Sequence, residues 1–252
     1  MLLLDIGNTH THVGLAVSRG VVRHEDIPTG FWFEGRAARR LARFCSPAGV
    51  AGISLCSVVP RATRLARDWA RKNCPARLLE LSVRSVWGLG VDYPRRETIG
   101  PDRLANAIAA RAQFGAPVLV VDFGTAVTLD VVDARGNYVG GIIAPGLAAM
   151  TDYLHEKTAL LPRVRLREVR RYLGRSTEEA MRIGAVHGYR GLVRELIGGL
   201  RRELRAPELP VVATGGYARL VARGLPEIRK VDPLLTLEGL RLFFQGTTVG
   251  RR

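Results

Sequence analysis

The sequence is poor in cysteine, and it contains no long run of apolar residues. Its three cysteines, Cys45, Cys56 and Cys74, form no CxxC pair, and an odd number suits no complete disulfide framework. No apolar run approaches the roughly 20 residues that a membrane-spanning helix needs. The N-terminal apolar stretch lacks the basic region of a signal peptide and is interrupted by Asp5. We therefore expect a cytoplasmic protein with reduced cysteines and no membrane partner.

Several common catalytic motifs are also absent. No glycine precedes a lysine, so there is no Walker A loop, and the Gly88-Leu89-Gly90 segment lacks the third glycine of a dinucleotide fingerprint. The five histidines form no HExxH motif, the cysteines have no zinc-site spacing, and no GxSxG elbow occurs. These absences argue against P-loop ATPases, zinc hydrolases and serine hydrolases.

Lysine and aromatic residues are scarce, although the chain is strongly basic. The net charge is +15 over 252 residues, and only three of the 38 basic residues are lysine. Such a charge makes nucleic acid the first class of partner to consider. However, the arginines are scattered in short pairs, and 6% aromatic residues are too few for a base-stacking platform. We expect a cationic surface around an anionic substrate, and no nucleic-acid partner.

The hydrophobic pattern predicts an α/β protein. In the first half we expect strands at 1–6, 12–17, 20–27, 49–60 and 76–82, and helices at 34–45, 61–73 and 102–114. In the second half we expect strands at 118–124, 126–133, 138–145 and 209–216, and helices at 146–160, 176–204, 215–223 and 237–246. The Gly- and Pro-rich segment 87–101 is typical of a functional loop or a domain joint.

Both halves open with the same pattern, an apolar strand followed by Asp-x-Gly, small polar residues and a second strand. Asp5 and Asp122 hold the corresponding positions. The recurrence indicates an ancient duplication, with two α/β domains, 1–114 and 115–252, facing each other across a cleft.

The two Asp-x-Gly turns are the candidate phosphate-binding elements. Gly7 permits a close backbone approach to a ligand, and the backbone amides with Asn8 and Thr9 offer donors to phosphate oxygens. Asp5 would repel a phosphate unless Mg²⁺ lay between them. The second turn repeats the arrangement at Asp122 and Thr125, so a polyphosphate could be held from both sides. The alternative is a pair of Asx turns without a chemical role.

Two further segments carry candidate residues. Gly215 and Gly216 follow an apolar strand and enter a predicted helix, whose N-terminus favours an anion or nucleotide. Asp102 begins the helix predicted at 102–114, either as its N-cap or as a carboxylate base for an attacking hydroxyl. Arg103 beside it could bind a carboxylate or phosphate of the substrate.

These motifs, in this order, resemble those of the type III pantothenate kinases, in the acetate kinase, sugar kinase, Hsp70 and actin superfamily. The resemblance rests on DIGNT at 5–9, SVVP at 57–60, GPDR at 100–103, DFGTA at 122–126, GGIIAPG at 140–146, and TGG at 214–216. It implies two duplicated ribonuclease H-like (actin-like ATPase) domains with mixed sheets flanked by helices. It also implies ATP-dependent phosphorylation of pantothenate to 4'-phosphopantothenate, the first step of coenzyme A biosynthesis.

The same resemblance assigns roles to individual residues. By analogy Asp5, Ile6, Gly7, Asn8 and Thr9 would hold the ATP phosphates and Mg²⁺, and Thr125 would contact ATP. Asp102 would accept the proton of the pantothenate hydroxyl, while Gly100, Pro101, Arg103 and Thr177 would contact pantothenate. Asp122 would bind a monovalent cation, K⁺ or NH₄⁺, and a homodimer would place Thr177 near a partner's active site. The family's tyrosine would correspond to Tyr93, although this sequence lacks the following Asn-Pro and has a longer spacer before GPDR.

Two alternatives remain open at this point. One is hydrolysis of a phosphate ester or polyphosphate on the same scaffold, with water replacing the hydroxyl. The other is a non-catalytic regulator that keeps the fold and binds nucleic acid through its cationic surface.

Overall fold

The computed structural model describes residues 1–46 and 49–249, and their contacts group into two units. The first unit comprises Met1–Ala116, Val132–Gly140 and Leu234–Arg252, and the second comprises Pro117–Val131 and Gly141–Pro233. By contacts the C-terminal segment therefore groups with the first unit, whereas the sequence places it in the second domain. The division at 114–115 stays a prediction.

The first unit contains a five-stranded mixed sheet. Its strand order is β3 (Gly20–Pro28), β2 (His10–Val17), β1 (Leu2–Ile6), β4 (Ile53–Ser57) and β5 (Leu78–Glu80). β1 pairs antiparallel with β2 and parallel with β4. All five residues of β1 are buried, as expected for a central strand that is covered on both faces.

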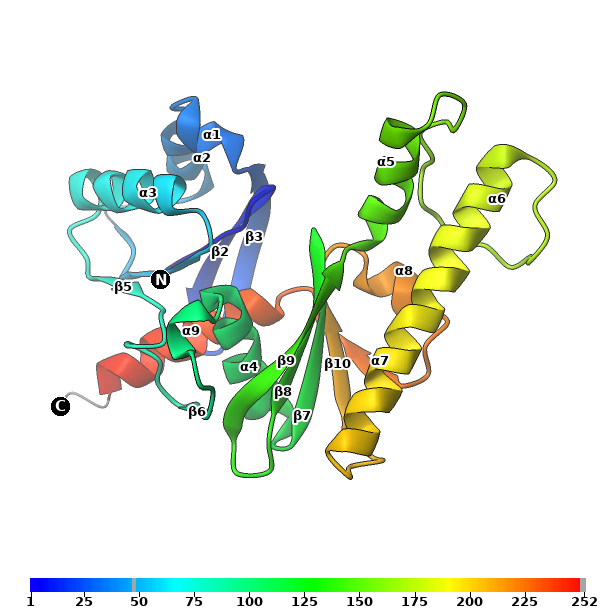
Figure 1. Ribbon diagram of the computed structural model, residues 1–252. Coiled ribbons are helices and arrows are strands. Elements are labelled where there is room, and N and C mark those ends of the chain that lie inside the picture. Colours follow the sequence, from blue (N-terminus) through cyan, green and yellow to red (C-terminus); the bar gives the residue numbers. More distant parts are fainter. Residues whose placement is uncertain (47–48, 250–252) are drawn as a thin grey trace. The chain divides into compact units, whose positions relative to one another are not determined.

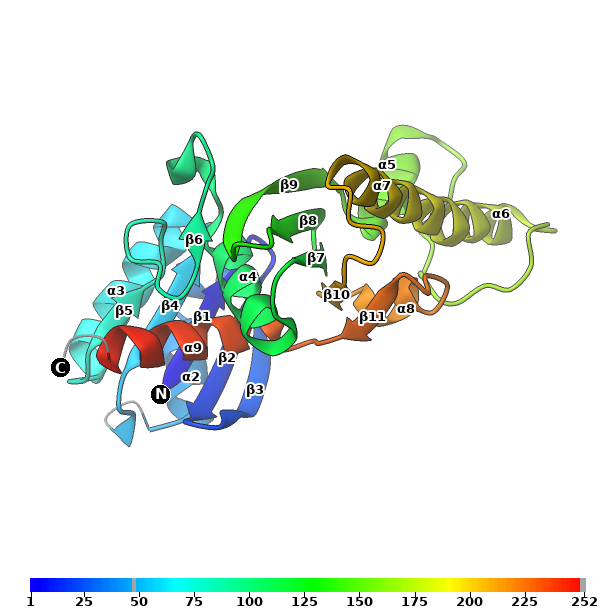
Figure 2. The ribbon, with the colours of Figure 1, turned by 90° about the horizontal axis from the view of Figure 1, so that it is seen from below.

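Helices cover both faces of this sheet (Figure 1). On one face lie α1 (Gly30–Phe33), α2 (Ala37–Phe44) and α3 (Pro60–Asn73), which share a hydrophobic core with the strands. On the other lie α4 (Pro101–Phe114) and α9 (Leu235–Val249), and Figure 2 shows α9 crossing the strands. α4 and α9 approach closely because Gly239 lies where a Cβ would be 1.9 Å from the Ala105 carbonyl oxygen.

The second sheet has the order β11 (Ile228–Val231), β10 (Val211–Thr214), β7 (Val118–Phe123), β8 (Ala126–Val132), β9 (Asn137–Pro145) and β6 (Gly90–Val91). β10 is parallel to both β7 and β11. The sheet neighbours β7 and β8, and likewise β8 and β9, are joined by turns too short for a crossover, so each pair is antiparallel. This sheet is therefore also mixed.

The helices of the second unit are α5 (Leu147–Lys157), α6 (Thr177–Ile183), α7 (Tyr189–Glu203) and α8 (Ala218–Ala222). The π-helical segment η3 (Gly184–Gly188) joins α6 to α7, so the helix expected at 176–204 is confirmed with a π turn inside it. Among residues 1–46 and 49–249, the short elements that sequence reasoning missed include α1, β6, β11 and the 3-10 helix η2 (Arg96–Thr98). Among residues 1–46 and 49–249, no helix is long and apolar enough to cross a membrane. The expected α/β class with helix-flanked mixed sheets is confirmed.

Candidate functional site

Asp5 is a buried carboxylate in the centre of the first sheet. It is 7% exposed and lies in register with His12 on β2 and Cys56 on β4. The Cys56 thiol donates a hydrogen bond to Asp5 Oδ1 at 3.2 Å. Burial raises the pKa of Asp5 above its ordinary value of 3.8, and the positive charge available to His12 opposes that rise. A cation beside this carboxylate would offset the cost of keeping it ionised.

The loop after β1 is held by hydrogen bonds to its carbonyl groups. Gly7 N–H donates to the His10 carbonyl at 3.0 Å, and a Cβ on Gly7 would lie 3.1 Å from that oxygen. Thr29, at the end of β3, donates from Oγ1 to the Gly7 carbonyl at 2.7 Å and from its N–H to the Thr9 carbonyl at 3.0 Å. The carbonyls thus bond to Thr29, while the Asn8 and Thr9 side chains are exposed.

A chain of buried hydroxyls reinforces this loop. Trp32 Nε1 donates to Thr11 Oγ1 at 3.1 Å, and the Thr11 and Thr29 hydroxyl oxygens are 3.1 Å apart. Because the Thr29 hydroxyl hydrogen goes to Gly7, Thr11 is the donor to Thr29. Sequence reasoning missed Thr11, Thr29 and Trp32, since nothing in the local pattern links residues 7 and 29. Hydrogen bonds in such a chain strengthen one another, so the loop is preorganised.

Asp102 lies in the first turn of α4, and it is not the N-cap. Gly100 is the N-cap and Pro101 the first helical residue, a position that suits proline because its missing N–H would be unpaired there anyway. Asp102 Oδ1 accepts a hydrogen bond from Arg103 N–H at 2.8 Å. A Cβ at Gly100 would lie 2.4 Å from Asp102 Oδ1, so this glycine leaves room for the carboxylate. A carboxylate in this first turn interacts favourably with the helix dipole.

Arg103 is close to Tyr138, which in turn contacts Tyr93. Its guanidinium carbon lies 5.7 Å from the centre of the buried Tyr138 ring, which meets the Tyr93 ring edge-on at 6.1 Å. Gly140, with φ of +136°, adopts a conformation that side chains rarely take, and a Cβ there would be 3.4 Å from the Tyr93 ring. The structure therefore connects Tyr93 to Arg103 through Tyr138, despite the longer spacer in the sequence. Sequence reasoning did not single out Tyr138.

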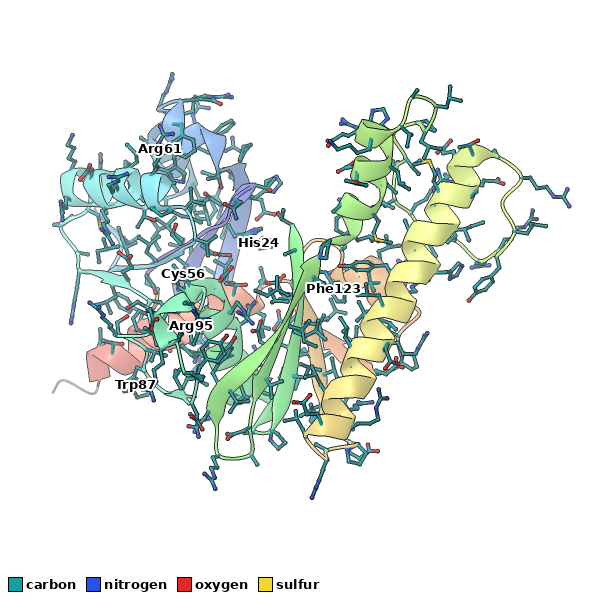
Figure 3. The ribbon with its side chains drawn as sticks, viewed as in Figure 1. His24, Cys56, Arg61, Trp87, Arg95 and Phe123 are labelled. Atoms are coloured by element: carbon teal, nitrogen blue, oxygen red, sulfur yellow. The ribbon has the colours of Figure 1, made fainter. Side chains whose placement is uncertain are left out.

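Cys56, labelled in Figure 3, is influenced electrostatically by two of the candidate carboxylates, Asp5 and Asp102. Its side chain is fully buried, and burial raises the pKa of the thiol well above its usual range, with Asp5 and Asp102 adding to the rise. The thiol is thus held protonated and able to donate to Asp5. Of the residues predicted from sequence, the first unit brings Asp5 and Asp102 near one buried sulfur.

In the second unit, Asp122 lies on β7 beside the loop that follows β10. Thr214 is in register with Asp122, and Tyr217 N–H donates to the Phe123 carbonyl at 3.3 Å. Gly215 has φ of +91°, and a Cβ there would lie 2.5 Å from Asp122 Oδ1. Only glycine therefore fits over this carboxylate. α8 spans five residues rather than the expected 215–223, so its dipole contributes less to an anion site at Gly216 than the sequence suggested.

The turn at Gly124 and Thr125 packs against the start of α5. Gly146, the N-cap of α5, donates its N–H to the Thr125 carbonyl at 3.1 Å, and a Cβ on it would be 2.4 Å from that oxygen.

Thr177 is the first residue of α6 and is exposed. It follows Ser176, whose hydroxyl caps the helix by accepting from Glu179 N–H at 3.2 Å.

The carboxylates suit a cation that is shared with a phosphate ligand. Among residues 1–46 and 49–249, no three histidine, cysteine, aspartate or glutamate side chains form a metal cage. Mg²⁺ binds through one or two carboxylates, with substrate phosphates and water completing its shell. A single buried carboxylate, Asp5, below an exposed loop fits that mode of binding.

Comparison with known proteins identifies the family. A family model described as type III pantothenate kinase matches residues 1–198. A type III pantothenate kinase of Akkermansia muciniphila is 47% identical over 242 residues, covering 96% of this chain and 96% of the relative. That of Methylacidiphilum infernorum is 44% identical, covering 96% of this chain and 87% of the relative.

Solved structures support the fold alone, because their sequences are distant. A Campylobacter jejuni protein described as a Baf family transcriptional activator has a TM-score of 0.64 at 19% identity, covering 99% of this chain and 100% of its own. An inorganic polyphosphate/ATP-glucomannokinase from Arthrobacter has a TM-score of 0.52 at 13% identity, covering 99% and 98%. With relatives of 44–47% identity over nearly its whole length, the chain belongs to the type III pantothenate kinase family.

Proposed function

We propose that Asp5 and Asp102 are the acidic groups through which this chain phosphorylates pantothenate with ATP. Membership of the family supports the reaction itself. It does not favour the two alternatives, a phosphate-ester or polyphosphate hydrolase and a non-catalytic nucleic-acid-binding regulator. The local structure around each residue supports this assignment. Asp5 is buried beneath an exposed, preorganised loop, and Asp102 lies in the first turn of α4 beside Arg103.

In this proposal the loop at 5–9 binds the phosphates of ATP. Asn8 and Thr9 offer polar groups to phosphate oxygens, while Gly7 keeps the backbone free of a side chain. Asp5 would hold Mg²⁺, which neutralises developing charge on the transferred phosphoryl group when it is bound. Ile6 is fully buried and anchors the loop to the core.

Asp102 would orient the pantothenate hydroxyl and accept its proton. A weak base is sufficient because positioning dominates phosphoryl transfer. Arg103 would bind the pantothenate carboxylate, with the Tyr138 ring 5.7 Å from its guanidinium carbon and the Tyr93 ring edge-on to Tyr138. Gly100 and Pro101 fix the direction in which Asp102 leaves the helix terminus.

The second unit would supply the remaining contacts. Asp122 would hold a monovalent cation, K⁺ or NH₄⁺, and Thr125, Gly215 and Gly216 would contact the nucleotide. The tight fit between Gly215 and the Asp122 carboxylate supports this grouping.

We further propose that the chain forms a homodimer in the cytoplasm, with Thr177 near the partner's site. The second unit carries large apolar side chains that are more than a third exposed, on β9, α5 and the segment after α5: Ile143, Met150, Tyr153, Leu154, Leu160, Tyr172 and Leu173. Exposed apolar surface of this kind marks protein–protein contacts.

The test is ATP consumption with and without pantothenate, first in K⁺ and then in Na⁺. We expect turnover only with pantothenate, and faster turnover in K⁺. ATP loss that is independent of pantothenate would instead support the hydrolase. Equal rates in the two salts would refute the role of Asp122.

A further inference from the structure

A second cationic site lies at the outer edge of the first sheet, apart from Asp5. It is a pocket of about 500 Å³ formed within the first unit by β3 and α2. Its lining residues come from the end of β3, from α1 and from the start and outer side of α2: Asp26, Ile27, Pro28, Phe31, Arg36, Arg39, Arg40 and Arg43. β3 is the edge strand, whereas Asp5 lies on β1, two strands further in.

Three of the four arginines, Arg39, Arg40 and Arg43, lie on α2, and Arg36 is its N-cap. Arg36 is three and four positions before Arg39 and Arg40, and Arg43 is four and three positions after them, so helical geometry places these side chains along one side of the helix. Like charges at this spacing destabilise a helix. A bound anion would convert that repulsion into attraction.

Two of the four arginines already have partners. Arg36 pairs with Glu34 at 2.8 Å and stacks over the Phe31 ring at 3.9 Å, and Arg40 pairs with Glu25. Both interactions hold their guanidinium groups in place.

The other two carry unbalanced charge. Of the ion pairs found among residues 1–46 and 49–249, none involves Arg39 or Arg43, and both side chains are exposed. The one carboxylate in the lining, Asp26, is itself paired with His12 Nδ1 at 2.7 Å.

We propose that this pocket binds a compact polyphosphate anion, either free or as the phosphate tail of a nucleotide. Arginine forks match phosphate oxygens in geometry and charge, and the concave shape limits the length of chain that fits. An extended nucleic acid would need a stripe of phosphate contacts longer than this pocket.

The experiment isolates this pocket from the ATP site. The protein is first saturated with a nonhydrolysable ATP analogue, with Mg²⁺ in excess, and tripolyphosphate is then titrated by calorimetry. We expect binding of one tripolyphosphate per chain if the pocket takes the free anion. If it takes a nucleotide tail, the analogue itself binds at two sites per chain and leaves no room for tripolyphosphate.

Paired variants assign the binding to these residues. The double variant Arg39→Gln/Arg43→Gln is expected to weaken the second binding event by at least about tenfold, because it removes charge-assisted hydrogen bonds to the anion. The control Arg64→Gln/Arg84→Gln removes the same charge from exposed positions elsewhere in the unit and should change the affinity less than about twofold, as expected for screened surface charges.

Three results would overturn the proposal. The first is the absence of a second binding event for either ligand, and the second is equal weakening of binding in both double variants. The third is binding of a short DNA duplex that depends on Arg39 and Arg43, with no binding of tripolyphosphate. Turnover of pantothenate without added tripolyphosphate should match the wild type in both variants. The failure of this site and the failure of the proposed kinase role are therefore distinguishable.

Discussion

Replacing Asp102 by asparagine separates its chemical role from its place in the helix. The introduced amide could still accept the hydrogen bond from Arg103 N–H through its side-chain oxygen. The favourable interaction of the charge with the helix dipole is lost, about 0.3–1 kcal/mol. In a chain of this size such a loss lowers the Tm by no more than about 4 °C. The fold and the ATP loop should therefore persist.

Turnover should respond very differently. An amide cannot accept the hydroxyl proton, and removal of a general base typically lowers kcat by about 10²–10⁴-fold, or roughly 3–5 kcal/mol in the barrier. The assay is steady-state ATP consumption at saturating pantothenate, with ATP affinity measured separately by calorimetry. Glu97→Gln removes one negative charge from an exposed position five residues upstream and serves as the matched control.

A second variant tests position rather than charge. Gly100→Ala keeps the carboxylate but introduces a Cβ 2.4 Å from Oδ1, so Asp102 must move. We expect kcat to fall with little change in ATP affinity. Near-normal turnover in Asp102→Asn would remove the assigned role, and so would a loss of turnover that is matched by an equal loss of ATP binding.

Three further predictions concern other residues of the two units. Burial raises the folded-state pKa of Asp5, so ionisation costs stability increasingly as pH rises from the unfolded value of 3.8 through the folded one. Asp5→Asn should abolish turnover, because its amide lacks the charge that would hold Mg²⁺. In Mg²⁺-free urea titrations its free energy of unfolding should rise relative to that of the wild type as pH rises, and a difference that does not vary with pH would contradict this. Gly215→Ala places a Cβ 2.5 Å from Asp122 Oδ1 and should reduce the dependence of the rate on K⁺, and an unchanged K⁺ titration would count against the cation role. Gly239→Ala should lower the free energy of unfolding by about 1–3 kcal/mol through overpacking between α4 and α9. Gly191→Ala, in open space on α7, should instead raise it by up to about 1 kcal/mol; similar effects of both would refute the packing argument.

The sequence was sufficient for most strands, most helices and the candidate carboxylates. Apolar runs such as residues 2–4 and 118–121 can be satisfied only in buried strands, and each is followed by an Asp-x-Gly turn whose position is local information. The position of Asp102 in a first turn was also readable, and of the two alternatives considered for it, the one as N-cap was wrong. Proline favours the first helical position, and this moved the cap to Gly100.

Only the tertiary structure decided which distant residues support these carboxylates. Thr29 and Trp32 hold the loop at residue 7, Cys56 donates to Asp5, and Tyr138 joins Arg103 to Tyr93. Such contacts depend on strand order and register, which pair residues far apart in the chain and leave no periodic signal. Hydrophobic periodicity reports whether a side chain is buried, whereas the partner it meets there is fixed only when the elements pack.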